Sequence, residues 1–183
     1  MKNKELKMLF KVEVDEEVSL CLLHESFAAR YVELLENDLD YIGQWMQWPY
    51  LCNTEESFKA FIKSSLHKYA DGTSINYAIE FKGEIVGNCG FNVINHELKN
   101  AEIGYWLGKN YQGNGIITRA CRYLIEYAFT EMAMKKVQIS AAKENKASRA
   151  VCERLGMTLE GIITQQEKIQ DRILDHAIYG IYN

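Results

Sequence analysis

The chain has 183 residues, of which 48% are hydrophobic and 25% charged, and its formal net charge is −4. This length predicts one domain over residues 1–183 with a core of ordinary size, and the composition excludes a disordered or fibrous protein. The basic residues are scattered, which disfavours a nucleic-acid surface, because such a surface needs a clustered basic footprint.

Neither the cysteines nor the histidines show the spacing of a metal site, so we predict no metal. The five cysteines are far apart and contain no Cys-x-x-Cys pair, which disfavours disulfides and indicates a reducing, cytoplasmic setting. The four histidines are interpreted as surface or structurally satisfied residues. No stretch has the length of a signal peptide core or approaches 18 apolar residues, so secretion and membrane spanning are disfavoured.

The N-terminal part of the chain combines strand and helix patterns. In chain order we expect strands over 7–13 and 18–23, a helix over 24–35, an irregular aromatic segment over 41–52 and a helix over 54–69. The first helix carries Phe27, Tyr31 and Leu34 on one stripe, and Thr54 is a candidate N-cap for the second.

The remainder is richer in strand patterns. In chain order we expect strands over 75–81, 84–93 and 100–107, a helix over 116–132, a strand over 137–141, a helix over 146–155 and strands over 158–168 and 173–181. Lys82-Gly83 predicts a hairpin turn, and Gly156 a helix C′ cap. This order predicts a mixed α/β sheet with helices inserted early and late.

Two glycines, Gly113 and Gly115, lie between a predicted strand and a long predicted helix in the segment GKNYQGNGIITRA. A Walker loop would need Gly-Lys-Ser/Thr at this point, and a dinucleotide fingerprint would need a third glycine where Thr118 stands. Backbone N–H groups at such a turn can bind an anion, and a first helical turn with Thr118 and Arg119 but no acid suits one. From the loop alone, an anion cradle and a plain strand-to-helix turn both stay open.

The loop and its neighbours resemble a known family. Residues 110–115 resemble the acetyl-CoA loop [RQ]-x-x-G-x-[GA] of the GNAT acetyltransferases, with Asn110 departing from the usual Arg or Gln. The segments AEIGYWL, YQGNGI, NKAS, ERLGM, LEG, QWP and DHAIY resemble the RimJ/RimL branch, which acetylates the N-termini of ribosomal proteins. The resemblance covers about residues 18–182. It implies an α/β GNAT (acyl-CoA N-acyltransferase) fold, a mixed, mostly antiparallel central sheet flanked by helices, and also a homo-oligomer.

The same resemblance implies that acetyl-CoA is the cosubstrate, gripped between two splayed strands that end near Leu107 and Ala141. The residues implied in binding are Trp106, Leu107, Gln112, Gly113, Asn114, Gly115, Ile116, Thr118 and Asn145. Gly104 would leave room for the ligand. Asn145 would also serve as an N-cap, and the two roles are compatible.

Acetyl transfer to an amine needs a base and a proton donor for the thiolate. Strand alternation places Glu102, Gly104 and Trp106 on one face, which makes Glu102 a candidate base. Glu167 matches the proposed base of the ribosomal branch, and both glutamates could instead be ordinary solvated or paired residues. The branch offers Ser148 as the proton donor, whereas Cys152 stands where many GNAT enzymes have a tyrosine and is interpreted as a buried thiol.

The resemblance therefore predicts an N-acetyltransferase whose acceptor is a primary amine, foremost the N-terminal α-amino group of a ribosomal protein. A polyamine or aminoglycoside acceptor stays open, as does a noncatalytic acetyl-CoA-binding module. A mononucleotide-binding protein is disfavoured by the missing Walker lysine. Trp45, Trp48 and Tyr50 are interpreted as the wall of an acceptor groove.

Overall fold

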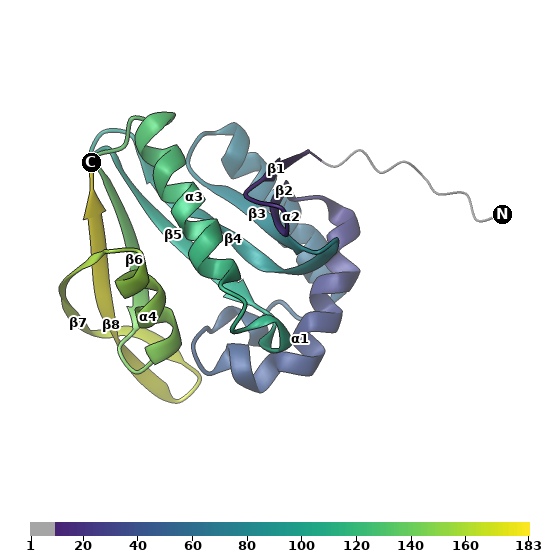
Figure 1. The fold of residues 1–183 in the computed structure, drawn as a ribbon. Coiled ribbons are helices and arrows are strands. Elements are labelled where there is room, and N and C mark those ends of the chain that lie inside the picture. The colour runs from purple at the N-terminus through teal and green to yellow at the C-terminus, as the bar shows by residue number, and fades with distance from the viewer. Residues whose placement is uncertain (1–9) are drawn as a thin grey trace.

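A computed structural model describes residues 10–183, in which eight strands form a single sheet (Figure 1). The strands are β1 (Lys11–Glu13), β2 (Val18–Leu22), β3 (Ile75–Phe81), β4 (Glu84–Asn95), β5 (Asn100–Leu107), β6 (Lys136–Ala142), β7 (Thr158–Ile169) and β8 (Arg172–Tyr182). Their order across the sheet is β1-β2-β3-β4-β5-β6-β8-β7. Only β5 and β6 pair in parallel; all other neighbours are antiparallel, which confirms the expected mixed, mostly antiparallel sheet.

Helices cover both faces of the sheet. They are α1 (Ala28–Gly43), α2 (Glu55–Ala70), α3 (Ile116–Thr130) and α4 (Lys146–Arg154). Figure 1 shows α3 and α4 on one face and α1 and α2 on the other. The apolar stripe of α3, including Ala120, Cys121 and Leu124, is buried in the larger hydrophobic core, as its spacing predicts. Helices α1 and α2 bury Tyr31 and Phe58 in a second core that also contains Trp106 of β5.

Helix α1 differs from the prediction at both ends. It follows a 3₁₀ turn over Glu25–Phe27 and continues to Gly43, eight residues beyond the expected end. The residues after Leu35 are mostly polar, but Asp38 among them is buried, and its Oδ2 accepts a hydrogen bond from the Lys109 backbone N–H at 2.6 Å. This contact stabilises a further turn of helix against the segment before α3. Helix α2 begins as expected, at a capping box formed by Thr54 and Ser57.

The N-terminal strand was expected to begin at residue 7, but residues 7–9 lie outside the described part of the chain. The segment expected to be irregular contains the end of α1 and a 3₁₀ turn over Trp48–Tyr50. The β3–β4 hairpin turn is confirmed, with positive φ at both Lys82 and Gly83.

Strands β5 and β6 pair only over their first four residues. The last pair is Ile103 with Ile139; beyond it, β5 pairs only with β4, and β6 only with β8. The two strands therefore diverge from Gly104 and Ser140 onward. The register of β4 with β5 also shifts between Phe91 and Val93, so that Asn92 is the extra residue of a β-bulge beside the divergence.

Candidate active site

The glycine loop joins the end of β5 to α3. Gly113 and Gly115 have φ values of 78° and 68°, and a Cβ on either would point into open space. Gly115 is the N-cap of α3, and no side chain of the described residues caps this helix. The first N–H groups of α3 have no acceptor within the helix, so they present a positive end to the open space above the loop. This arrangement can bind a phosphate through backbone groups alone.

Arg119 does not offer its charge to this space, which corrects the expectation drawn from the first turn of α3. Its Nη1 lies 3.0 Å from Asp15 Oδ2 and 3.2 Å from Glu17 Oε2, both in the turn between β1 and β2. Its Nη2 donates to the backbone oxygen of Asn114 at 3.0 Å. Arg119 thus ties the glycine loop to the β1–β2 turn.

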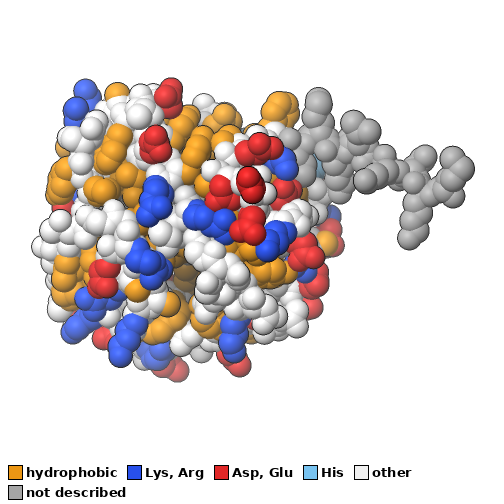
Figure 2. All heavy atoms as spheres, in the orientation of Figure 1, with side chains coloured by type: hydrophobic (Ala, Val, Ile, Leu, Met, Phe, Trp, Pro, Cys, Tyr) orange, Lys and Arg blue, Asp and Glu red, His pale blue; other side chains and the backbone are white. Residues whose placement is uncertain are grey.

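Other cations lie near the start of α3. Nε of Arg154, at the end of α4, donates to Oγ1 of Thr118 at 3.3 Å. Figure 2 shows Lys and Arg side chains gathered on the face formed by α3 and α4. Arg154 of α4 is therefore a cation near the start of α3 that the sequence analysis did not name.

On the same face, a pair of hydroxyl groups joins β5 to α4, the helix that follows β6. Asn145 caps α4 as predicted, its Oδ1 accepting from the Ser148 N–H at 3.1 Å. Ser148 Oγ lies 2.8 Å from Tyr105 Oη, so a hydrogen bond joins α4, which follows β6, to β5. Burial raises the pKa of Tyr105 well above its ordinary value, so this phenol stays protonated and has a proton available for the hydrogen bond with Ser148.

Cys152, one turn further along α4, has no solvent exposure, and burial raises the pKa of its thiol to about 12. This agrees with its interpretation as a buried thiol. The role of Ser148 as proton donor stays a prediction, and Tyr105 is a hydrogen-bond partner of Ser148 that the sequence analysis missed. Its side chain could have been placed toward α4 from strand alternation, but the contact with Ser148 depends on how α4 packs.

The opposite face carries Glu102 and Gly104, as alternation predicts. Glu102 Oε2 accepts a hydrogen bond from Gln138 Nε2 at 3.0 Å, across the last part of the β5–β6 pairing. The space beside Gly104 is filled, because a Cβ there would overlap the side-chain amide of Asn92. The expectation that Gly104 leaves room for a ligand is therefore wrong on this face: the bulge of β4 places a polar side chain there.

The aromatic residues on this face divide into two groups. Trp106 is buried, with its ring centroid 5.2 Å from that of Tyr31 and 5.5 Å from that of Trp48. The side chain of Trp106 is thus part of the core, so this residue presents its backbone to the divergence, and Trp48 is partly buried against the same core. Trp45 and Tyr50 instead pack against a small apolar cluster of β6, β7 and β8, formed by Ala142, Ile169 and Leu174.

Glu167 contacts His176, which in turn contacts Ser140, and the sequence analysis connected neither residue to it. His176 Nε2 of β8 lies 3.2 Å from Glu167 Oε2, and His176 Nδ1 lies 2.8 Å from Ser140 Oγ. The side chain of His176 is 13% exposed and that of Glu167 is 34% exposed. The segment DHAIY contains His176, but only the register of β6, β8 and β7 brings it between Ser140 and Glu167.

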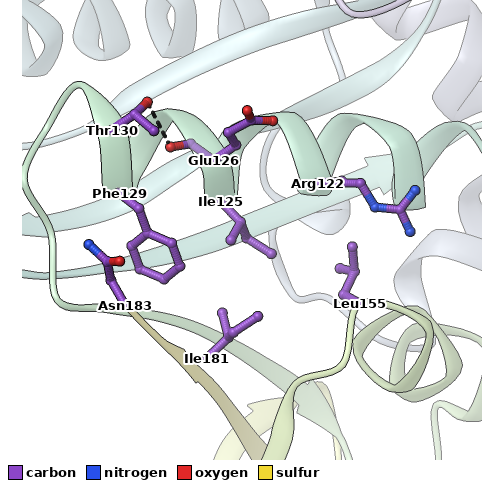
Figure 3. Close-up of a pocket in the computed structure, with 8 residues that line it drawn as sticks. All are labelled: Arg122, Ile125, Glu126, Phe129, Thr130, Leu155, Ile181 and Asn183. Carbon is purple, nitrogen blue, oxygen red and sulfur yellow. Dashed lines mark hydrogen bonds between the residues drawn. The ribbon is translucent and has the colours of Figure 1, made fainter.

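A separate groove of about 400 Å³ lies between the C-terminal half of α3 and the end of β8 (Figure 3). Its lining includes Ile125, Phe129 and Ile181, and it contains none of the predicted site residues.

In residues 10–183, no helix is long and apolar enough to cross a membrane. The same residues contain no cluster of three or more His, Cys, Asp or Glu side chains placed to hold a metal ion.

A sheet whose two parallel strands diverge under a glycine loop and a helix N-terminus defines the class of acyl-CoA N-acyltransferases. Comparison with known sequences agrees: the family of the acetyltransferase (GNAT) domain matches residues 22–158. The chain belongs to this GNAT acetyltransferase family.

Three proteins illustrate its relatives. YdaF of Bacillus subtilis (strain 168) is 34% identical over 154 residues, 84% of each chain. Spermidine N(1)-acetyltransferase of Escherichia coli (strain K12) is 30% identical over 132 residues, 72% of this chain and 68% of the other. The structure of RimL, a ribosomal L7/L12 alpha-N-protein acetyltransferase in complex with coenzyme A, superposes with a TM-score of 0.90 at 25% identity, covering 94% of this chain and 98% of that one.

Proposed function

We propose that the chain transfers the acetyl group of acetyl-CoA to the α-amino group at the N-terminus of a protein, with a ribosomal protein as the acceptor. The observation that carries this proposal is the divergence of β5 and β6. The backbone N–H groups at the start of α3 lie at one end of it. The hydroxyl pair of Tyr105 and Ser148 lies on one face of the sheet, and the glutamates lie on the other. RimL, which shares the fold over most of both chains, supports the choice of acceptor. The same proposal includes a single GNAT domain and a cytoplasmic location. The location is supported by the five cysteines, which are all free.

The residues predicted to bind acetyl-CoA fall into two groups in this arrangement. The loop residues Gln112 to Gly115, together with Ile116 and Thr118, would hold the pyrophosphate through backbone N–H groups and the Thr118 hydroxyl. Leu107, the backbone of Trp106 and the Asn145 amide line the diverging strands, where the pantetheine arm would lie. When bound, acetyl-CoA supplies the thioester that the amine attacks.

Glu102 and Glu167 are the candidate bases on the acceptor face. An α-amino group has a pKa of about 8, so the base needs to remove one weakly held proton, either directly or through water. The glutamate takes that proton first, which frees the lone pair of the nitrogen, and passes it to water. As the nitrogen then bonds to the carbonyl carbon, the carbon–sulfur bond breaks, and the second proton that the nitrogen loses passes to the same glutamate. Ser148 Oγ would donate a proton to the departing sulfur, with the Tyr105 hydroxyl donating to Ser148 in turn.

A small polyamine is the second candidate acceptor. The similarity to spermidine N(1)-acetyltransferase favours it, and the net charge of −4 would attract a polycation at low salt. A noncatalytic acetyl-CoA-binding module is the third candidate, and it requires no working base.

The test combines binding with turnover. We expect acetyl-CoA to raise the melting temperature more than ATP or NAD, and thiol release to depend on N-terminal peptides rather than on spermidine. Glu167→Gln and Glu102→Gln should separate the two bases, with the true base costing about 10²-fold or more in kcat. Thiol release with spermidine alone would move the proposal to the polyamine acceptor, and unchanged turnover in both variants would refute the base assignment.

A further inference from the structure

Glu167 lies on an edge strand, at the point where pairing with β8 resumes after a bulge. Strand β7 forms one edge of the sheet and pairs only with β8. Its register shifts just before this residue: Ile163 lies opposite His176, whereas Glu167 lies opposite Leu174, so three residues of β7 oppose the single residue Asp175. Gln165 in this bulge has a φ of 53°. The ladder is therefore interrupted on one side of Glu167, and a side-chain contact is needed to fix the direction of its carboxylate.

His176 provides that contact from a well-paired position. Strand β8 pairs on both sides, with β6 and with β7, and His176 lies directly opposite Ala142 of β6. Its ring is largely buried, with Nε2 3.2 Å from Glu167 Oε2 and Nδ1 2.8 Å from Ser140 Oγ. The imidazole thus reaches from the interior of the sheet to a carboxylate at the edge.

The two contacts together select one tautomer. A carboxylate oxygen beside Nε2 favours a proton on that nitrogen, because a lone pair there would face a negative charge. Nδ1 then accepts, and the Ser140 hydroxyl donates to it. Ser140 is the first residue of β6 beyond its last pair with β5, so this anchor lies where the two strands diverge.

We propose that His176, oriented by Ser140, is a positioning residue that fixes the Glu167 carboxylate toward the acceptor amine. The inference rests on the proposed function, because it takes Glu167 as the base. With Oε2 lying 3.2 Å from His176 Nε2, an ion-pair contact rather than an aligned hydrogen bond, Oε1 is the oxygen left to accept the proton of the amine. Glu102 forms a separate pair with Gln138, two residues before Ser140 on the same face of β6, and does not depend on His176.

The test is a double-mutant cycle between positions 167 and 176, run with whichever amine the wild type accepts. We expect His176→Ala to lower kcat about 10-fold and leave the KM for acetyl-CoA within about twofold, because the residue acts on the base and not on binding. His176→Gln, which keeps an N–H donor near the Nε2 position, should restore most of the activity. In the Glu167→Gln background, His176→Ala should cost little more. The control is His67→Ala, at an exposed position on α2.

The outcomes distinguish the positioning role of His176 from the role of Glu167 as the base. If Glu167→Gln lowers kcat but His176→Ala does not, or if the two losses multiply, the positioning role is refuted while the base stands. If Glu167→Gln has no effect, both are refuted. Nitrogen-15 NMR of the His176 ring, which needs no turnover, should show a protonated Nε2 and an accepting Nδ1, changed by Ser140→Ala; the opposite tautomer would overturn the inference even in a protein that accepts no amine tested.

Discussion

The hydroxyl oxygens of Tyr105 and Ser148 lie 2.8 Å apart and join β5 to α4 across the point where β5 and β6 diverge. Ser148 is also held from its backbone, since its N–H donates to the capping Asn145. The serine hydroxyl is thus oriented from two sides. Because Tyr105 is largely buried and stays protonated, its O–H can donate to Ser148 and leave the serine proton free for another acceptor.

Tyr105→Phe tests this orientation. Removal of one neutral hydrogen bond costs about 1 kcal/mol, so we expect kcat to fall about 3- to 10-fold, with the KM for acetyl-CoA little changed. Ser148→Ala should cost more, about 10²-fold, because it removes the donor itself. Tyr69→Phe, at an exposed position on α2, serves as the control. A Tyr105→Phe variant with wild-type kcat would mean that the pair is only structural.

For a substitution at Cys152 we expect the opposite result, little change in kcat. With its thiol fully buried and its pKa raised to about 12 by burial, it should not supply the proton. We expect Cys152→Ala to keep kcat within about twofold and to lower the free energy of unfolding by about 1 kcal/mol, through lost packing alone. Steady-state kinetics and urea unfolding give the two quantities. A large loss of kcat without a loss of stability would return Cys152 to the site.

Much of this site follows from local patterns in the sequence. The glycine loop, the Asn145 cap and the alternation that places Glu102 and Trp106 on one face each depend on a few consecutive residues. The hairpin at Lys82-Gly83 is equally local, because both residues need positive φ. Such features could be predicted since their causes lie within one turn or one strand.

The missed contacts join distant residues. The Ser140–His176 bond spans 36 residues, and the Tyr105–Ser148 bond spans 43. The length of α1 depends on Asp38, a polar residue that is buried because it accepts from Lys109, 71 residues later. Register, bulges and helix packing decide these contacts, and no pattern within one element encodes them. The charge of Arg119 was misjudged for the same reason, since its partners lie on the β1–β2 turn.

Gly115→Ala tests the loop as a binding site. Positive φ makes a Cβ cost about 1 kcal/mol at this residue, and that Cβ would enter the space where a pyrophosphate would lie. We expect the acetyl-CoA-induced rise in melting temperature to shrink strongly and the KM for acetyl-CoA to rise about 10-fold or more. Gly83→Ala is a matched control, because Gly83 also has positive φ and open space but lies in the β3–β4 hairpin. Equal effects of both variants on binding would mean that the loop is only a turn.

The clamp between Asp15 and Arg119 predicts how stability depends on pH. Burial raises the pKa of Asp15, but hydrogen bonds from the N–H groups of Glu17 and Val18, together with Arg119, outweigh it and leave the pKa below its ordinary value. A carboxyl whose folded pKa is lowered stabilises the protein fully above its unfolded pKa of about 4, and this contribution is lost as the pH falls through the folded value.

Asp15→Asn should therefore lower the free energy of unfolding at pH 7, and the difference from the wild type should begin to shrink as the pH falls below about 4 and vanish below the folded pKa of Asp15. Urea unfolding between pH 2.5 and 7 measures both curves. Because Arg119 also donates to the backbone of Asn114, the variant should loosen the glycine loop and raise the Kd for acetyl-CoA at pH 7. Parallel unfolding curves at all pH values would show that the Asp15 carboxylate does not stabilise the fold, and an unchanged Kd would show that the loop holds its shape without the clamp.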